Sequence, residues 1–279
     1  MRLVIMTDLD GCVLDPGTYD YKTVLPLVER LKKQGIEIIF NSSKTRLEQL
    51  LYIKRLGLQD VVFIVENGAA IYIPKKKAVE ESINDKGCFD KDDYYVCVLG
   101  KTIDEIKKTI NDIINDYRDY IMWMDEITPE LFTELTGLPV DESVLALKRE
   151  YSYLFIPKTE DKSIINEVVE KIKKRGLNIQ ISGVGISQIN GKHDKGKALQ
   201  LLRNLLKEYR EAHIIAVGDA MNDASMLRVA DTGVLLGVNP DVIARVERYD
   251  LVIMNSKGSR AWRNALARLT GNYDLVVRG

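Results

Sequence analysis

Cysteine and histidine are scarce, with three cysteines and two histidines among 279 residues. Cys12, Cys88 and Cys97 form no CxxC pair and are odd in number. This pattern matches neither a disulfide framework nor a cysteine-rich zinc site. We therefore expect a protein of the reducing cytoplasm.

The chain also lacks an excess of one charge and any long apolar run. Forty Lys and Arg residues face 41 Asp and Glu residues, so the formal net charge is −1. Binding to a nucleic-acid backbone needs a surplus of positive charge, and nucleic acid is therefore not an expected partner. The amino-terminal residues hold no signal-peptide core, and nowhere do about 18 apolar residues follow one another, so we expect no membrane partner either.

What is present is the composition of a globular protein, with 46% hydrophobic and 29% charged residues. Apolar runs at residues 3–6, 36–40 and 61–65 predict buried strands. Helical spacing of apolar residues over 23–34 and 45–56 predicts helices between them. The order strand, helix, strand, helix, strand is typical of an α/β protein with a mostly parallel, Rossmann-like sheet.

A charged stretch from residue 75 to 93 interrupts this alternation. The segment that follows predicts a separate α+β sheet, with strands at 94–99, 146–156 and 178–181 and helices at 103–117, 129–136 and 163–175. After residue 189 the first pattern returns, with helices at 197–209, 224–229 and 260–269 and strands at 214–217, 234–236 and 251–253. We expect one core domain formed by residues 1–80 and 190–279, interrupted by an inserted domain at 81–189.

Two acidic clusters follow predicted strands of the core. Asp8 and Asp10 come directly after the first strand, and Asp219 and Asp223 follow the strand at 214–217. Carboxyl ends of parallel strands share one edge of a sheet, so these carboxylates should meet and would suit Mg²⁺. Read alone, the first cluster could be an Asp-Gly turn with solvated acids. The second could be an ordinary strand-turn-helix connection capped by Asn222 or Asp223.

Two further segments precede helices and could bind an anion. Residues 41–44 offer the hydroxyls of Ser42 and Ser43, although a plain helix cap has the same composition. Residues 191–197 carry three lysines, which a solvated basic turn would also explain. They fit a P-loop pattern except for Ala198, where Ser or Thr should stand, so a nucleotide-binding protein is a remote alternative. That alternative leaves Asp8 and Asp10 without a role.

Taken together, the motifs resemble those of the haloacid dehalogenase superfamily. The resemblance rests on Asp8-Leu9-Asp10-Gly11, on Ser42, on Lys195 and on Gly218-Asp219 with Asn222-Asp223. It implies a Rossmann-like parallel-sheet core with an α+β cap domain inserted between the second and third motifs. The combination is far more specific than any one motif.

Within that superfamily, four segments are similar to the mannosyl-3-phosphoglycerate phosphatase family: residues 38–46, 64–68, 149–152 and 194–198. The sequence departs from that family's pattern at Tyr153 and at residues 183–186. The resemblance implies a phosphatase that converts mannosyl-3-phosphoglycerate into phosphate and the compatible solute mannosylglycerate. Glucosyl-3-phosphoglycerate or another sugar phosphate is the alternative substrate.

The same resemblance implies roles for the acidic residues. Asp8 would be the nucleophile that forms an aspartyl-phosphate, and Asp10 would be the general acid and base. Mg²⁺ would be held by the Asp8 carboxylate, the Asp10 backbone carbonyl, Asp219 and Asp223.

Substrate contacts are implied in the same way. Ser42 and Lys195 would hold the phosphoryl oxygens, with Ser43 and Asn222 as supporting donors. Lys44 would reach the rest of the substrate. Arg149, in the inserted domain, would contact a carboxylate or a sugar, unless it forms only a surface ion pair.

Overall fold

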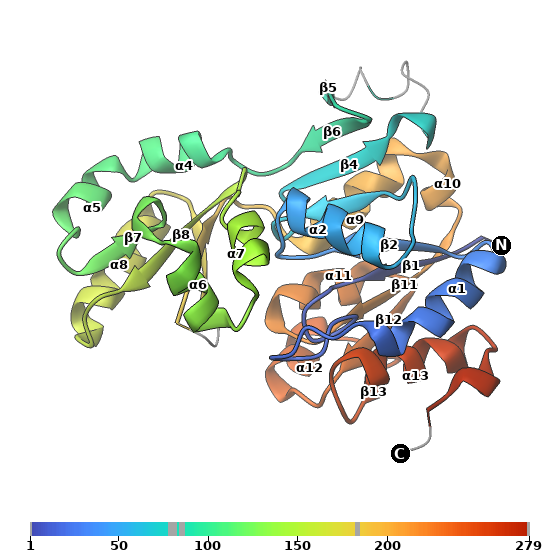
Figure 1. Ribbon diagram of the computed structural model, residues 1–279. Helices are drawn as coiled ribbons and strands as arrows, with labels where there is room; N and C mark the ends of the chain where they lie inside the picture. The colour runs from blue at the N-terminus through green and yellow to red at the C-terminus, as the bar shows by residue number, and fades with distance from the viewer. Residues whose placement is uncertain (1, 78–82, 84–86, 182–184, 278–279) are drawn as a thin grey trace. The chain divides into compact units, whose positions relative to one another are not determined.

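The computed structural model describes residues 2–77, 83, 87–181 and 185–277 (Figure 1). The chain divides into two compact units, the second of which is inserted into the first. The first unit comprises Met1–Lys44, Gln49–Val98 and Asp194–Gly279, and the second comprises Thr45–Glu48 and Leu99–His193. Within the described residues, no helix is long and apolar enough to cross a membrane.

The first unit is built on a nine-stranded sheet in the order β13-β12-β11-β1-β2-β3-β4-β6-β5. The strands are β1 (Leu3–Thr7), β2 (Glu37–Asn41), β3 (Phe63–Val65), β4 (Ala70–Pro74), β5 (Phe89–Lys91), β6 (Tyr94–Val98), β11 (His213–Gly218), β12 (Thr232–Leu236) and β13 (Val252–Met254). The six strands from β13 to β3 pair in parallel, whereas β4, β6 and β5 join antiparallel. The predicted α/β fold with a mostly parallel sheet is therefore confirmed.

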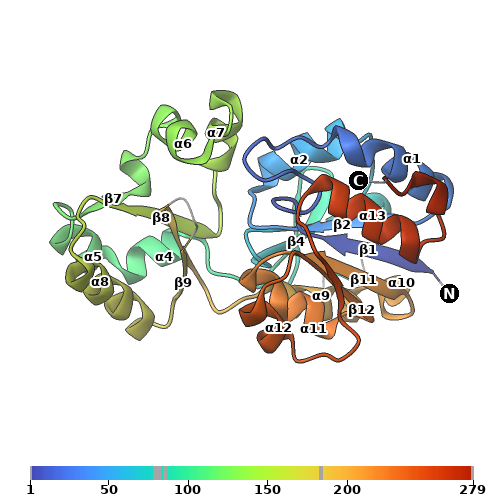
Figure 2. The ribbon, with the colours of Figure 1, turned by 90° about the horizontal axis from the view of Figure 1, so that it is seen from below.

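Helices cover both faces of this sheet, which explains why the middle residues of its central strands are apolar. Figure 2 shows α1, α2 and α13 on one face and α9, α11 and α12 on the other. The helices are α1 (Leu25–Lys33), α2 (Arg46–Arg55), α9 (Lys195–Leu205), α10 (Lys207–Arg210), α11 (Ala224–Val229), α12 (Pro240–Val246) and α13 (Ser259–Leu269). Trp262 of α13 is fully buried, and its indole N–H donates to Thr7 Oγ1 at the end of β1 (2.9 Å).

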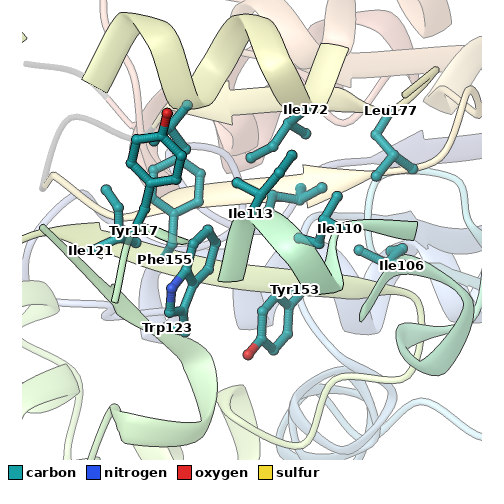
Figure 3. Packing of buried hydrophobic residues seen from close by; sticks show 12 residues of the cluster. Ile106, Ile110, Ile113, Tyr117, Ile121, Trp123, Tyr153, Phe155, Ile172 and Leu177 are labelled. Carbon is teal, nitrogen blue, oxygen red and sulfur yellow. The ribbon is translucent and has the colours of Figure 1, made fainter. Parts of the chain in front are cut away.

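The second unit has its own four-stranded antiparallel sheet in the order β7-β8-β10-β9. Its elements are α4 (Ile103–Thr109), α5 (Asn111–Asp116), β7 (Ile121–Trp123), α6 (Pro129–Thr136), α7 (Val140–Ala146), β8 (Ser152–Pro157), α8 (Lys162–Lys174), β9 (Asn178–Ile181) and β10 (Ser187–Asn190). Side chains of α4, α5 and α8 pack on one sheet face around Trp123, Tyr153 and Phe155 (Figure 3). This unit therefore has a hydrophobic core of its own.

The structure differs from the sequence expectations at several elements. The helix expected at 197–209 ends at Leu205, because Leu206 has an extended backbone. The strand expected at 146–156 begins only at Ser152, because Val140–Ala146 is helical. The helix expected at 103–117 is interrupted at Ile110, where the backbone leaves the helical region. The strand at Tyr94–Val98, placed by its sequence in the insertion, pairs with β4 and extends the large sheet.

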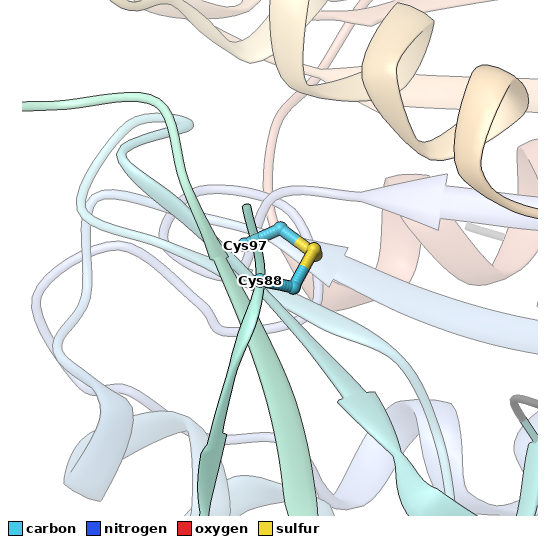
Figure 4. The surroundings of a disulfide bond; sticks show 2 residues. All are labelled: Cys88 and Cys97. Atoms are coloured by element: carbon cyan, nitrogen blue, oxygen red, sulfur yellow. A yellow bond between two sulfur atoms is a disulfide. The ribbon is translucent and has the colours of Figure 1, made fainter. Parts of the chain in front are cut away.

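A disulfide joins Cys88 to Cys97, so the expectation of cysteines without a disulfide was wrong (Figure 4). The antiparallel register of β5 and β6 places Phe89 opposite Val96, which brings Cys88 opposite Cys97. Their Cα atoms lie 4.2 Å apart. The count is odd because Cys12 stays a buried free thiol. Sequence spacing alone does not reveal this pair, because the hairpin register decides it.

We expect thiol titration to report this pairing directly. Protein purified without reductant should show no reactive thiol when native, one when denatured, and three after denaturation and reduction. The single thiol is Cys12, whose side chain is inaccessible in the folded chain. The Cys97→Ser variant is the control, and it should show two thiols when denatured without reductant. Three thiols in the unreduced, denatured wild type would contradict the disulfide.

Candidate active site

Three predicted carboxylates meet at the carboxyl end of the parallel sheet. Strands β1 and β11 are neighbours, with Thr7 opposite Val217, so the residues that follow them emerge side by side. Asp8 continues the ladder, because its N–H donates to Val217 O (3.0 Å). Oxygens of Asp8, Asp219 and Asp223 all lie within 4.8 Å of one another, and all three side chains are buried.

Two glycines allow this close approach. Gly11 has a φ of +70°, and a Cβ built there would overlap the Asp219 carboxylate. A Cβ at Gly218 would overlap the Asp223 side chain in the same way. A side chain at Gly11 would push the two acidic loops apart, and one at Gly218 would displace Asp223 within its own loop.

Lys195 provides the counter-charge for two of the acids. It is fully buried at the first position of α9, with Nζ 2.8 Å from Asp8 Oδ2 and 2.6 Å from Asp223 Oδ1. Asn41 Nδ2 donates to the Lys195 carbonyl (3.0 Å) and fixes the start of the helix. Burial opposes the charged amine, but attraction by Asp223 and Asp8 prevails, so the pKa of Lys195 is raised. The amine is therefore an ammonium at neutral pH.

Lys257, which was not predicted from the sequence, contacts Asp219. Its Nζ donates to Asp219 Oδ2 at 2.8 Å. Lys257 follows β13, the last parallel strand. Its position after a parallel strand could have indicated that it lies at the same edge of the sheet as the carboxylates. The pKa of the Asp219 carboxyl is raised to about 7. Burial is the largest cause, and the negative charges of Asp223 and Asp8 add to it, whereas Lys257 lowers the pKa.

Asp10 lies beside a second cluster. Its side chain is 40% exposed, and Oδ1 lies 3.1 Å from Nζ of Lys44, whose side chain is only 4% exposed. The Lys44 ammonium lies over the rings of Tyr19 (5.4 Å) and Tyr52 (5.8 Å). The two tyrosines were not predicted, since they are 33 residues apart and only the fold joins them.

Ser42 and Ser43 lie in the loop after β2, and Asn222 lies in the loop after β11. The Ser42 N–H donates to Ile64 O (3.1 Å), and its carbonyl accepts from Asn67 N–H (2.9 Å). Asn222 Nδ2 donates to Asn67 Oδ1 (3.0 Å), which ties the loop after β11 to the loop after β3. Ser42 is fully buried and Ser43 half-buried. Their contacts with substrate remain predictions.

Arg149 belongs to the second unit, where its Nη1 donates to Ser152 Oγ (2.9 Å). Its predicted contact with a carboxylate or sugar remains a prediction. Tyr153, where the family pattern changes, has its ring in the core of that unit and donates from its hydroxyl to Asp125 Oδ2 (3.0 Å). The sequence also departs from the family pattern at residues 183–186. Residues 183 and 184 of this segment lie outside the described residues.

The P-loop alternative finds no support in the segment before α9. Asp194 caps this helix, because its Oδ1 accepts from the Lys197 N–H (2.8 Å). A carboxylate therefore already occupies the place that a phosphate would need at the helix N-terminus. Lys197 Nζ lies 3.5 Å from the Asp194 carboxylate, and its side chain is largely exposed.

The carboxylates fit a divalent cation of the Mg²⁺ class. Mg²⁺ prefers oxygen ligands. One carboxylate oxygen from each of Asp8, Asp219 and Asp223 lies within 4.8 Å of the other two, so the three could hold a single ion. Four carboxylates, counting Asp10, meet three ammonium groups at this edge of the sheet. A divalent cation would reverse that balance in favour of a phosphate dianion.

Comparison with known proteins agrees with this geometry. The model of the haloacid dehalogenase-like hydrolase family matches residues 5–246. The chain belongs to this hydrolase family. A glucosyl-3-phosphoglycerate/mannosyl-3-phosphoglycerate phosphatase of Persephonella marina is 33% identical to this hydrolase over 98% of both chains. A mannosyl-3-phosphoglycerate phosphatase of Pyrococcus furiosus is 38% identical over 85% of this chain and 92% of its own. With such relatives, the hydrolase is a phosphatase.

Solved structures support the fold of this hydrolase. TM0651 from Thermotoga maritima superposes with a TM-score of 0.66 at 20% identity, covering 96% of this chain and 97% of that one. BT1666 of Bacteroides thetaiotaomicron, a phosphatase of the haloalkanoate superfamily, gives a TM-score of 0.66 at 17% identity, covering 99% and 96%. At these identities the likeness concerns the fold.

The raised pKa of Asp219 predicts a pH effect on stability in the hydrolase without metal. Unfolded Asp219 is ionised above about pH 4, whereas the folded residue loses its proton only near pH 7. The free energy of unfolding should therefore fall by about 1 kcal/mol between pH 6 and pH 8, because ionisation then occurs in a buried acidic cluster.

Chemical unfolding in EDTA at the two pH values measures this effect. Asp219→Asn is the matched control, because it removes the titrating group and should reduce the difference. Mg²⁺ should stabilise the wild type more at pH 8 than at pH 6, since cation and proton compete for the carboxylate. An unchanged pH difference in Asp219→Asn would contradict the assignment.

Proposed function

We propose that this phosphatase is Mg²⁺-dependent and hydrolyses mannosyl-3-phosphoglycerate to mannosylglycerate and phosphate. The observation that carries the proposal is the buried group of Asp8, Asp219 and Asp223 with Lys195 at the carboxyl end of β1 and β11. It occurs in a chain whose relatives, at 33 and 38% identity, are named for this substrate. The Cys88–Cys97 disulfide removes the cysteine argument for a reducing cytoplasm, so a cytoplasmic location stays a prediction.

In the first half-reaction, an Asp8 oxygen attacks phosphorus and forms an aspartyl-phosphate. The bond between phosphorus and the ester oxygen breaks, and Asp10 donates a proton to that leaving oxygen. Lys195 and Ser42 hold the phosphoryl oxygens, supported by Ser43. Bound Mg²⁺ would reduce the repulsion between the Asp8 carboxylate and the phosphate dianion.

In the second half-reaction, Asp10 accepts a proton from water as the water oxygen attacks phosphorus. The bond from phosphorus to Asp8 breaks, which regenerates the carboxylate and releases phosphate. Asn222 supports the phosphoryl group from the loop after β11. The exposed Asp10 side chain suits this exchange of protons with leaving group and water.

Residues of the second unit would select the organic part of the substrate, with Arg149 as a candidate contact. Glucosyl-3-phosphoglycerate is the second candidate substrate, because the relatives from Persephonella marina and Methanococcoides burtonii are named for both glycosyl compounds. The two substrates differ only in their sugar, so chemistry at Asp8 does not separate them.

A substrate panel tests the proposed function. Phosphate release should be fastest with mannosyl-3-phosphoglycerate, beside glucosyl-3-phosphoglycerate, hexose phosphates and p-nitrophenyl phosphate. EDTA should abolish release, and added Mg²⁺ should restore it. Preference for the glucosyl compound would replace the first substrate by the second. Turnover of only the simple phosphates would refute both and leave a phosphatase for another sugar phosphate.

A further inference from the structure

We propose that Lys44, whose ammonium lies over the rings of Tyr19 and Tyr52, binds a carboxylate of the leaving group and thereby selects phosphoglycerate esters over sugar phosphates that lack a carboxylate. The inference rests on the proposed function in one respect, because the role of Asp10 marks the side from which the leaving group departs. All four residues lie in the first unit. The cluster of Lys44, Tyr19 and Tyr52 is called the lysine cage below.

The position of Lys44 places a buried positive charge next to the leaving group. Its Nζ lies 3.1 Å from Asp10 Oδ1, and Asp10 must touch the ester oxygen to protonate it. In a 3-phosphoglycerate ester the carboxylate lies roughly 4 to 5 Å from that oxygen, three carbon atoms along the chain. An anionic group at this distance from the ester oxygen would reach Lys44 while the oxygen contacts Asp10.

The cage stabilises the positive charge of Lys44 and shields it from water, because the ammonium lies over the faces of the two tyrosine rings. Tyr52 is fully buried, and the side chain of Lys44 is nearly so. Water is therefore largely excluded from the ammonium, which strengthens its attraction for a carboxylate. The Tyr21 ring packs edge-on against Tyr52 (6.2 Å), and Arg55 lies over the same ring (5.2 Å). These contacts hold the cage in a defined shape.

The loop that carries Tyr19 is folded to hold its ring at this position. Tyr19 has a φ of +54°, a left-handed conformation that a bulky side chain adopts only at a cost. Hydrogen bonds of the surrounding loop hold Tyr19 in this conformation. Asp15 N–H donates to Asp20 O (3.0 Å), and Tyr19 N–H donates to Asp15 O (2.9 Å). The N–H of Ser259 donates to Asp15 Oδ1 (2.8 Å) and anchors the loop to α13. Strain retained beside the reacting groups indicates a function for the ring.

If Lys44 only oriented Asp10, its loss would affect the substrates differently. A positioning residue for Asp10 affects every substrate by the same factor, because each ester needs the same proton transfer. A residue that binds the carboxylate affects the substrates that carry one more than those that do not. The ratio of kcat/KM for two matched substrates therefore separates the two roles.

Two substrate pairs differ only at the carboxylate. The first is mannosyl-3-phosphoglycerate and its analogue in which CH₂OH replaces the carboxylate. The second is 3-phosphoglycerate and glycerol 3-phosphate. We expect the wild type to favour the carboxylate member, and Lys44→Met to lower this preference by about 100-fold in kcat/KM, the scale of a lost buried charge contact. Lys44→Arg should restore part of the preference, because it keeps the charge.

Lys257→Met is the matched control, because it removes the same charge from the same sheet edge but from Asp219 rather than from Asp10. It should slow both members of a pair and leave their ratio unchanged. Equal losses on both members in Lys44→Met would overturn the proposal. Circular dichroism and thermal unfolding of each variant show whether it is folded.

The second pair keeps this test independent of the proposed function. If neither glycosyl ester is hydrolysed, the proposed substrate is refuted. In that case 3-phosphoglycerate and glycerol 3-phosphate still measure whether a carboxylate is recognised. Calorimetric binding of the same two compounds to the Mg²⁺-loaded Asp8→Asn variant gives the preference without turnover. Absence of any preference for the carboxylate member in rate and in binding would overturn the inference about Lys44.

Discussion

Asp8→Asn is expected to lower phosphate release by about 10⁴-fold or more, with the fold retained. The amide has the shape of the carboxylate but is too poor a nucleophile to attack phosphorus. Asp8 lies within the acidic group and contacts Lys195, which places it at the centre of the site. Phosphate release gives the rate, and intact-protein mass after acid quenching detects the aspartyl-phosphate.

Wild-type protein mixed with substrate should show the added phosphoryl mass, and Asp8→Asn should not. Asp60→Asn is the matched control for the change of charge, because Asp60 pairs only with the exposed Lys76 in the described contacts. It should keep its full rate and its covalent intermediate. Activity of Asp8→Asn above 1% of wild type would remove Asp8 from the role of nucleophile.

Lys195→Met is expected to impair both activity and stability. The ammonium is buried between Asp8 and Asp223, and its removal leaves two buried carboxylates without their counter-charge. Breaking such a pair typically costs 3–5 kcal/mol, so we expect a loss of about that size in EDTA at neutral pH. Activity should fall about 10³-fold, because the phosphoryl oxygens lose their charged donor.

The stability loss should shrink in acid and with Mg²⁺. Burial raises the pKa of Asp223, so lowering the pH neutralises a carboxylate that Lys195 no longer balances. A bound divalent cation compensates the same charge. Lys197→Met is the control on the same helix, because its side chain is largely exposed, and it should unfold like wild type. Wild-type stability of Lys195→Met in EDTA would contradict the assigned ion pairs.

The placement of the acidic clusters is determined by local sequence. Strands Leu3–Thr7 and His213–Gly218 each contain a continuous apolar run, and each strand is followed at once by a carboxylate. In a parallel sheet with helices on both faces, the carboxyl ends of such runs lie at one edge. Strand periodicity and chain direction therefore place Asp8, Asp219 and Asp223 at the same edge, whereas their close contact depends on the pairing of β1 with β11.

Other features depend on contacts that sequence spacing does not encode. Lys257 reaches Asp219 across 38 residues, and Tyr19 and Tyr52 meet at Lys44 only after α2 packs on the sheet. The Cys88–Cys97 disulfide depends on the register of one antiparallel hairpin. Short-range periodicity is enough to predict the α/β core and its acidic edge. Which lysine balances which carboxylate depends on the folded chain, since side chains from distant segments meet only after the chain has packed.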